Sequence, residues 1–142
     1  LGDVYKRRPE NFDIYQERDK ALALAAKVFE QDLILLAGFL KKIGPYFLDS
    51  FEGMIINTHP SLLPDYGGRG MYGRKIHEQV FADKKEYTGV TIHWVNEEYD
   101  LGQIIAPSKV KIREEESVDI IESKVKALEK SCLAETLNEI SN

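Results

Sequence analysis

The chain is poor in the residues that build disulfide frameworks and metal sites. Its 142 residues contain one cysteine and three histidines, and none of the four has the spacing of a zinc motif, so we expect no metal. Cys132 has no second cysteine with which to form an internal disulfide, which favours a reducing, cytoplasmic compartment. No apolar run reaches the length of a membrane span, and the first residues show no signal-peptide pattern, so no membrane partner is expected.

An excess of basic residues and phosphate-loop motifs are also missing. The formal net charge of −5 argues against a broad nucleic-acid surface, so no nucleic-acid partner is expected. No GxGxxG or Walker pattern occurs anywhere in the chain. The length and the ordinary content of hydrophobic residues, 43%, predict one globular domain spanning residues 1–142.

The apolar pattern alternates between helical and strand periods. We expect helices at 12–29, 45 onward, 71–82 and 117 onward, and strands at 32–37, 53–57, 87–95 and 103–112. The continuous run 32–37 predicts a parallel strand buried on both faces, whereas the alternation in 87–95 predicts a half-buried strand. In the helix at 71–82 we expect Ile76, Val80 and Phe81 to face inward and His77 to lie at the surface or in helix packing. This order predicts an α/β fold, with a sheet that is parallel at first and mixed at one edge, flanked by helices.

The stretch Met54–Tyr66 carries the most specific signal. An apolar run ends in Asn57 and His59, and open α/β sheets bind ligands just beyond the carboxyl ends of strands. Strand alternation gives these two side chains a common face. Pro60 and Pro64 stiffen the segment that follows, so we expect an ordered loop; Leu63–Pro64 is a candidate cis bond, although trans is the default.

Three polar residues suit acyl transfer when they are taken together. Asn57 can donate to a developing oxyanion, and His59 can carry protons near neutral pH. Asp100 lies in a glycine-ended loop after a strand, where a carboxylate can orient an imidazole or bond its own backbone as a turn residue. Gly38, directly after a buried strand, suits either close approach of a ligand or an ordinary tight turn.

These residues carry a resemblance to a known family. The runs Asn57–Pro64, Gly89–Val95, Asp100–Gly102 and Leu36–Leu40 resemble phosphoribosylglycinamide formyltransferase, a folate-dependent family of purine synthesis. The resemblance extends from about Asp32 to Glu129. It implies a Rossmann-like formyltransferase fold and transfer of a formyl group from 10-formyltetrahydrofolate to the amine of glycinamide ribonucleotide.

The resemblance also implies roles for single residues. Asn57 would steady the oxyanion, His59 would assist beside it, and Asp100 would organise a water and relay protons. Leu36, Gly38, Phe39, Lys41 and Ile43 would lie at the folate, and Thr58 and Glu129 at the amine substrate, with Glu129 at its ribose. His93 matches a family histidine behind the site, which we interpret as a supporting residue.

Two features depart from the family pattern. The N-terminal strand and Gly/Ser/Asn-rich loop that bind the substrate phosphate in the family have no counterpart here, so the chain resembles the C-terminal portion of the family domain. Without the first βα units one edge or face of the sheet would be exposed, and the chain would then aggregate, swap elements or pair with a second copy as a homodimer. In addition, the segment Gly67–Gly73 replaces a histidine-bearing loop of some members.

Other functions remain open at this stage. A formyltetrahydrofolate deformylase passes the formyl group to water, and a methionyl-tRNA formyltransferase passes it to an aminoacyl-tRNA. Pro60 favours the purine enzyme over both, and the acidic charge weighs against the tRNA enzyme. Sugar-nucleotide formyltransferases are harder to exclude. A protein of another class, a non-catalytic folate-binding fragment, is the remaining alternative.

Overall fold

The computed structural model describes residues 14–29, 32–38, 43–95 and 103–141. Its elements, in chain order, are α2 (Ile14–Phe29), β1 (Leu33–Ala37), α3 (Pro45–Ser50), β2 (Met54–His59), α4 (Arg74–Ala82), β3 (Tyr87–Trp94), β4 (Ile104–Lys111) and α5 (Val118–Ser141). Each predicted helix and strand is therefore present. Pro45 opens α3, where its missing N–H costs nothing, and the Ser117 hydroxyl accepts a bond from the Ile120 N–H in the first turn of α5.

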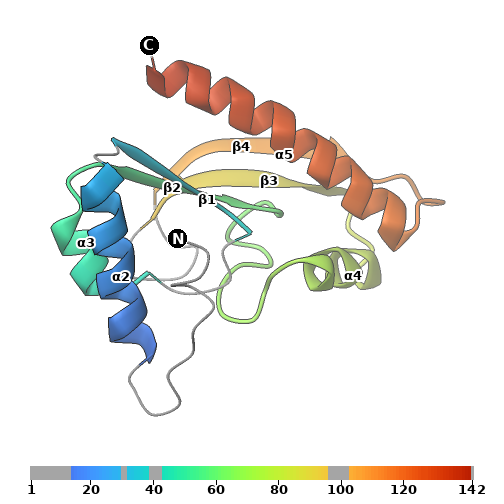
Figure 1. The fold of residues 1–142 in the computed structure, drawn as a ribbon. Coiled ribbons are helices and arrows are strands. Elements are labelled where there is room, and N and C mark those ends of the chain that lie inside the picture. The colour runs from blue at the N-terminus through green and yellow to red at the C-terminus, as the bar shows by residue number, and fades with distance from the viewer. Residues whose placement is uncertain (1–13, 30–31, 39–42, 96–102, 142) are drawn as a thin grey trace.

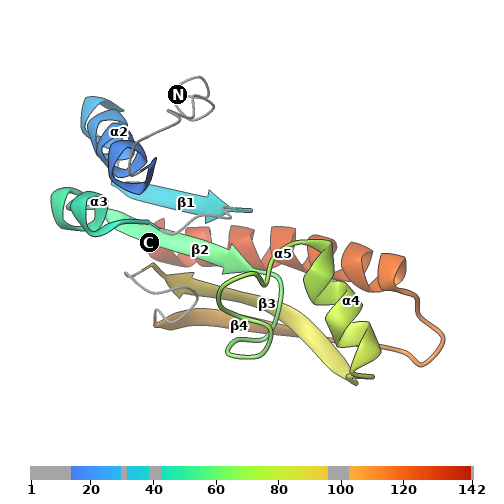
Figure 2. The same cartoon turned by 90° about the horizontal axis from the view of Figure 1, so that it is seen from below.

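The four strands form one sheet in the order β1-β2-β3-β4. β1 and β2 are parallel, whereas β3 pairs antiparallel with both β2 and β4. The predicted α/β sheet with a mixed edge is confirmed, although antiparallel pairing takes a larger share of the described sheet than expected. Helix α5 crosses one face of the sheet, and α2 and α3 lie together beside β1 and β2 on the other side (Figures 1 and 2).

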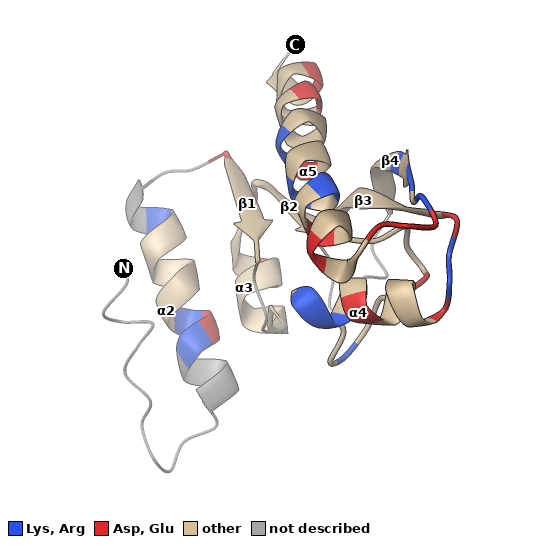
Figure 3. Cartoon of the chain, turned by 90° about the vertical axis from the view of Figure 1, so that its right-hand side faces the viewer, with Lys and Arg blue, Asp and Glu red and all other residues tan. Residues whose placement is uncertain are grey.

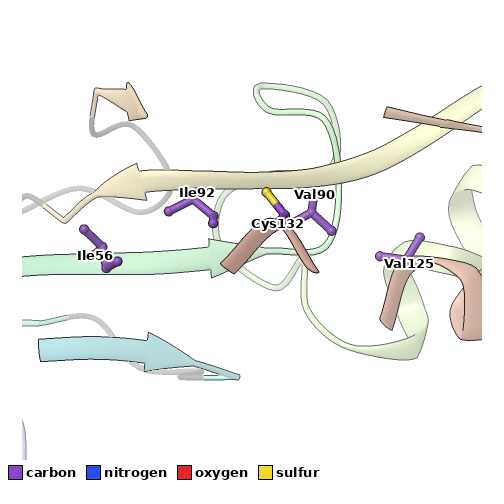
Figure 4. Packing of buried hydrophobic residues seen from close by; sticks show 5 residues of the cluster. All are labelled: Ile56, Val90, Ile92, Val125 and Cys132. Atoms are coloured by element: carbon purple, nitrogen blue, oxygen red, sulfur yellow. The ribbon is translucent and has the colours of Figure 1, made fainter. Parts of the chain in front are cut away.

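Strand β2 contributes to a hydrophobic core on each face of the sheet. Ile56 packs with residues of β3 and α5, among them Val90, Ile92, Val125 and Cys132 (Figure 4). The neighbouring Ile55 packs against Ala26 of α2 and Phe47 of α3. Because successive strand residues point to opposite faces, Asn57 and His59 continue the Ile55 side and Thr58 continues the Ile56 side.

A carboxylate from α2 caps the start of α3. Asp19 is 2% exposed and accepts bonds from the Gly44 N–H (2.8 Å) and the Phe47 N–H (2.7 Å). These donors lie at the positive end of α3, which has no side-chain cap of its own. A Cβ at position 44 would lie 2.6 Å from Asp19 Oδ2, so only glycine fits there. The contact fixes where the chain enters α3 after β1.

Burial differs from the sequence predictions in two strands. β1 is only partly buried, not enclosed on both faces, because β2 is its one neighbour within the described residues. β3 is almost wholly buried, not half-buried. Its second face is covered by the loop after β2, since Thr91 bonds Ser61 and Leu63 in that loop.

Three local predictions also need correction. Strand β2 extends to His59 rather than ending at residue 57, and α4 begins at Arg74 rather than residue 71. Phe81 is 49% exposed and does not face inward, whereas Ile76 and Val80 are buried as predicted. The Leu63–Pro64 bond is cis. No helix among the described residues has the length and apolar character needed to cross a membrane.

Candidate active site

A cavity of about 590 Å³ opens where β1 and β2 end. Its lining comprises Gly38, the consecutive residues 57–60, residues 68–73 and residues of α4 and α5. The cavity therefore lies beyond the carboxyl ends of two parallel strands, where open α/β sheets bind ligands. It brings together five of the predicted site residues, since its lining includes Gly38, Asn57, Thr58, His59 and Glu129.

The Asn57 amide is held in a defined orientation by His93. The two residues are opposite one another in the antiparallel ladder, and Asn57 Nδ2 lies 3.1 Å from His93 Nε2. His93 Nδ1 lies 3.0 Å from the Trp94 carbonyl oxygen, which can only accept, so Nδ1 carries the proton and Nε2 is the acceptor. Asn57 therefore donates one N–H to His93, and the second N–H of the same amide nitrogen is available to a ligand oxygen in the cavity.

The His59 imidazole is fixed by the loop that follows it. It is 5% exposed, and its Nε2 donates to the Tyr66 carbonyl oxygen at 2.7 Å, because a carbonyl oxygen can only accept. The Tyr66 hydroxyl in turn donates to Asp83 at 2.6 Å, and burial together with this carboxylate raises the pKa of Tyr66 to about 12. The tyrosine thus stays protonated at neutral pH and ties the loop to the end of α4.

A threonine of β3 anchors the same loop from below. The Thr91 hydroxyl is fully buried, donates to the Ser61 carbonyl oxygen at 2.7 Å and accepts from the Leu63 N–H at 2.9 Å. The Ser61 hydroxyl donates to the Asp65 carbonyl oxygen at 2.6 Å. These bonds satisfy buried backbone groups of the loop, so His59 sits on an ordered support, as the two prolines predicted.

Thr58 and Glu129 come together across 71 residues of sequence. The Thr58 hydroxyl donates to Glu129 Oε1 at 2.7 Å, which holds this carboxylate at the cavity wall. Glu122, Lys126 and Glu129 follow one another at helical spacing and share the cavity face of α5. Lys126 Nζ lies 3.0 Å from Glu122 Oε1, and this bond lowers the pKa of Glu122. The α5 wall therefore presents two carboxylates with an ammonium between them.

His77 belongs to the cavity wall, which the sequence analysis missed. It is 3% exposed and lines the cavity from α4, and its buried Nδ1 has no hydrogen-bond partner among the described residues. Burial lowers the pKa of His77; Glu122 and Glu129 oppose this, and Lys126 and Arg74 add to it. The histidine is therefore neutral at pH 7. The sequence analysis expected His77 at the surface or in helix packing, and the side chain is indeed packed. Only the fold shows that it packs at the wall of the cavity.

We expect His77 to make the protein less stable in mild acid. Because its pKa in the folded state lies below the ordinary value, the unfolded chain takes up the proton first as the pH falls below about 6.5. The stability that neutral His77 contributes is complete above that pH and is lost as the pH falls towards the folded pKa. Urea unfolding at pH 7.5, 6.5 and 5.5 measures the free energy of unfolding. We expect this free energy to fall less steeply with decreasing pH in His77→Gln than in the wild type, and the two slopes should differ by at most about 1.4 kcal/mol per pH unit. An equal dependence of the free energy of unfolding on pH in the two proteins would contradict the lowered pKa of His77.

The remaining predicted site residues are placed differently. Leu36 and Ile43 pack in the core cluster with α2 and α3 and do not line the cavity. Phe39, Lys41 and Asp100 lie outside the described residues. The roles of all five towards a ligand stay predictions. Within the part of the chain that the structure describes, no three histidine, cysteine or acidic side chains lie close enough to hold a metal ion.

Comparisons with known proteins agree with this geometry. The family model described as "Formyl transferase" matches residues 4–137. The chain is 49% identical over 81 residues to the chloroplastic phosphoribosylglycinamide formyltransferase of Arabidopsis thaliana, covering 57% of this chain and 28% of that protein. It is 40% identical over 120 residues to phosphoribosylglycinamide formyltransferase of Haemophilus influenzae, covering 84% of this chain and 54% of the relative.

Solved structures show the same relationship. The crystal structure of phosphoribosylglycinamide formyltransferase from Bacillus halodurans superposes with a TM-score of 0.82 at 33% identity, covering 93% of this chain and 66% of that one. The chain thus spans about half, or less, of the length of the two curated relatives named above. Since the family model matches nearly the whole of it, the chain belongs to the formyl transferase family.

Proposed function

We propose that this chain carries the transfer site of a phosphoribosylglycinamide formyltransferase. The reaction moves a formyl group from 10-formyltetrahydrofolate to the primary amine of glycinamide ribonucleotide. The observation that carries the proposal is the Asn57 amide, which His93 orients so that one N–H remains for an oxygen in the cavity. That donor lies at the end of β2 with the buried His59 two residues further on.

The residues suggest how the reaction proceeds. The amine nitrogen forms a bond to the formyl carbon, and negative charge develops on the formyl oxygen, where the Asn57 N–H stabilises it. His59 supports this charge from the neighbouring position, and Asp100 takes up the proton that the amine loses. The bond from the formyl carbon to the folate nitrogen then breaks, and that nitrogen receives the proton that Asp100 took up from the amine. Holding amine and formyl carbon together removes much of the entropic part of the barrier.

The wall of α5 suits the acceptor side of this reaction. Glu129, held by Thr58, can accept bonds from sugar hydroxyls of a ribonucleotide. We assign the amine substrate to this wall and the folate to the side of Gly38. The cytoplasmic location, the single domain and a homodimer stay predictions.

The proposal is tested by following tetrahydrofolate release. The purified chain is mixed with 10-formyltetrahydrofolate, with and without glycinamide ribonucleotide. We expect release that depends on the amine and that is nearly abolished in Asp100→Asn, whose far-ultraviolet circular dichroism should match that of the wild type. Unchanged turnover in Asp100→Asn would contradict the role of this residue. Release without the amine would indicate a deformylase, and no release in either mixture would favour the non-catalytic folate-binding alternative.

A further inference from the structure

We propose that Thr58 is a positioning residue for the acceptor: its hydroxyl holds the Glu129 carboxylate in the orientation that receives the ribose hydroxyls of the amine substrate. This inference rests on the proposed function, because that proposal assigns the sugar to Glu129. Thr58 then acts on the substrate through Glu129 rather than through a contact of its own.

Thr58 offers a hydroxyl whose position is fixed by the sheet. Its Cα pairs with Ala37 of β1 on one side and with Ile92 of β3 on the other, so its backbone is held in two ladders. The side chain is 5% exposed, and a β-branched residue has few χ1 rotamers open to it. From this position the hydroxyl donates to Glu129 Oε1 at 2.7 Å, a length typical of a bond to a charged acceptor. The donor therefore has little freedom to follow the carboxylate if the carboxylate moves.

The helix that carries Glu129 is also anchored to the sheet. Val125 lies one turn before Glu129 and Cys132 lies three residues after it, and both belong to the buried core between α5 and the sheet (Figure 4). Ser108 of β4 donates its hydroxyl to Cys132 Sγ at 3.1 Å. The backbone at residue 129 therefore has a fixed place, and the side-chain torsions of the glutamate are what remains free. The bond from Thr58 selects among these rotamers.

A cation on α5 is the alternative partner for this carboxylate. Lys126 precedes Glu129 by three residues, a spacing at which a lysine and a glutamate on a helix can form an ion pair. Lys126 Nζ instead lies 3.0 Å from Glu122 Oε1, and within the described residues the bond that Glu129 makes is the one from Thr58. Figure 3 shows acidic and basic residues on neighbouring turns of α5. We expect Glu129 to turn towards Lys126 when residue 58 cannot donate, which would leave the carboxylate less able to bind sugar hydroxyls.

The bond from Thr58 leaves Glu129 able to accept from a ligand. A carboxylate has about four acceptor sites on its two oxygens, and Thr58 occupies one of them at Oε1. Both residues line the cavity, and Glu129 is only partly buried. Neighbouring hydroxyls of a ribose can therefore donate to a carboxylate that is already oriented. Because the carboxylate is ordered before the substrate arrives, the loss of this bond should lower the affinity for the substrate rather than the rate of the chemical step.

Replacement of Thr58 by valine removes the hydroxyl and keeps the shape of the side chain. We expect Thr58→Val to weaken the binding of glycinamide ribonucleotide, measured by titration calorimetry, roughly three- to tenfold. In the transfer assay, KM for this substrate should rise by the same factor, while kcat and KM for 10-formyltetrahydrofolate stay within about twofold of the wild type. Thr58→Ser, which retains the donor, should recover most of the affinity. The analogue of glycinamide ribonucleotide that lacks both ribose hydroxyls should bind equally to the wild type and to Thr58→Val.

Thr88→Val is the matched control. Thr88 is 2% exposed, lies on β3 outside the cavity lining, and has a hydroxyl without a hydrogen-bond partner among the described residues. The same loss of a buried hydroxyl should therefore leave the affinity, KM and kcat unaltered. A double-mutant cycle with Glu129→Ala separates positioning from direct contact, because Thr58→Val should have little further effect once the carboxylate is gone.

Four results would overturn the assignment. They are no binding of glycinamide ribonucleotide by the folded wild type, equal affinity in the wild type and Thr58→Val, no recovery in Thr58→Ser, and additive losses in the cycle. A loss confined to KM for 10-formyltetrahydrofolate would place residue 58 at the folate and refute its role towards the acceptor. Binding that depends on the Thr58 hydroxyl without formyl transfer would support the positioning role and refute only the proposed function.

Discussion

Replacement of Asn57 by alanine is expected to lower kcat by roughly 10²–10³-fold with little change in the fold. The amide is the donor that His93 orients towards the cavity, and removing one oxyanion donor typically has an effect of this size. The folded state loses a single hydrogen bond, which costs about 1 kcal/mol. Steady-state kinetics with 10-formyltetrahydrofolate and glycinamide ribonucleotide, together with urea unfolding, measures both quantities.

A double-mutant cycle separates the donor from its support. His93→Gln should lower kcat less than Asn57→Ala, because the donor remains but its orientation is no longer fixed. The double variant should be close to Asn57→Ala, since His93 acts through Asn57. Asn138→Ala, the same change at an exposed position near the end of α5, should leave kcat unaltered. Additive losses in the cycle would show that His93 acts independently of Asn57.

Replacement of Gly89 by alanine is expected to be the most damaging small substitution for the fold, costing roughly 3 kcal/mol of unfolding free energy. A Cβ at this position would collide with the Ser108 carbonyl oxygen of β4 and would lie 2.7 Å from Leu62 Cδ2. Leu62 can adjust, but the Ser108 backbone is held in the β3–β4 ladder, where it pairs with Val90. The two strands would have to separate locally.

Gly38→Ala is the matched control for this substitution. Gly38 has a φ of +66°, and no atom of the described residues, its chain neighbours aside, lies within 4 Å of the position of its added Cβ. The substitution is therefore expected to lower the free energy of unfolding by about 1 kcal/mol, because alanine tolerates the positive φ less well than glycine. Urea unfolding of both variants should give clearly different midpoints. Equal midpoints for Gly38→Ala and Gly89→Ala would show that the close approach of β3 and β4 relaxes at little cost.

The sequence predicted the helices, the strands and the strand end at the cavity well, because these depend on local pattern. Asn57 and His59 were placed at a strand end from an apolar run and the residues that stop it, and both line the cavity. The predicted buried face of α4 was right for two of its three residues: Ile76 and Val80 are inside, but Phe81 is exposed, since a helical stripe defines a face only to within one residue.

Contacts between distant residues were beyond the sequence pattern. The bond from Asn57 to His93 depends on the antiparallel register of β2 and β3, which alternation alone does not determine. The burial of β3 depends on the loop after β2, which covers its second face. The partial burial of β1 depends on the number of strands beside it. Glu129 was assigned only through family resemblance, whereas His77 carried no signal that distinguishes a cavity wall from ordinary packing.

The alternation of β2 has a consequence for how such a site can diverge. Thr58 projects on the α5 side of the sheet, and Asn57 and His59 project on the other, although the three codons are contiguous. Under the proposed function, the two faces of the strand have separate tasks: the partner of residue 58 on α5 contacts the acceptor, and residues 57 and 59 contact the group being transferred. The same proposal implies that a lineage can exchange its acceptor by changing position 58 and α5 while it keeps residues 57 and 59.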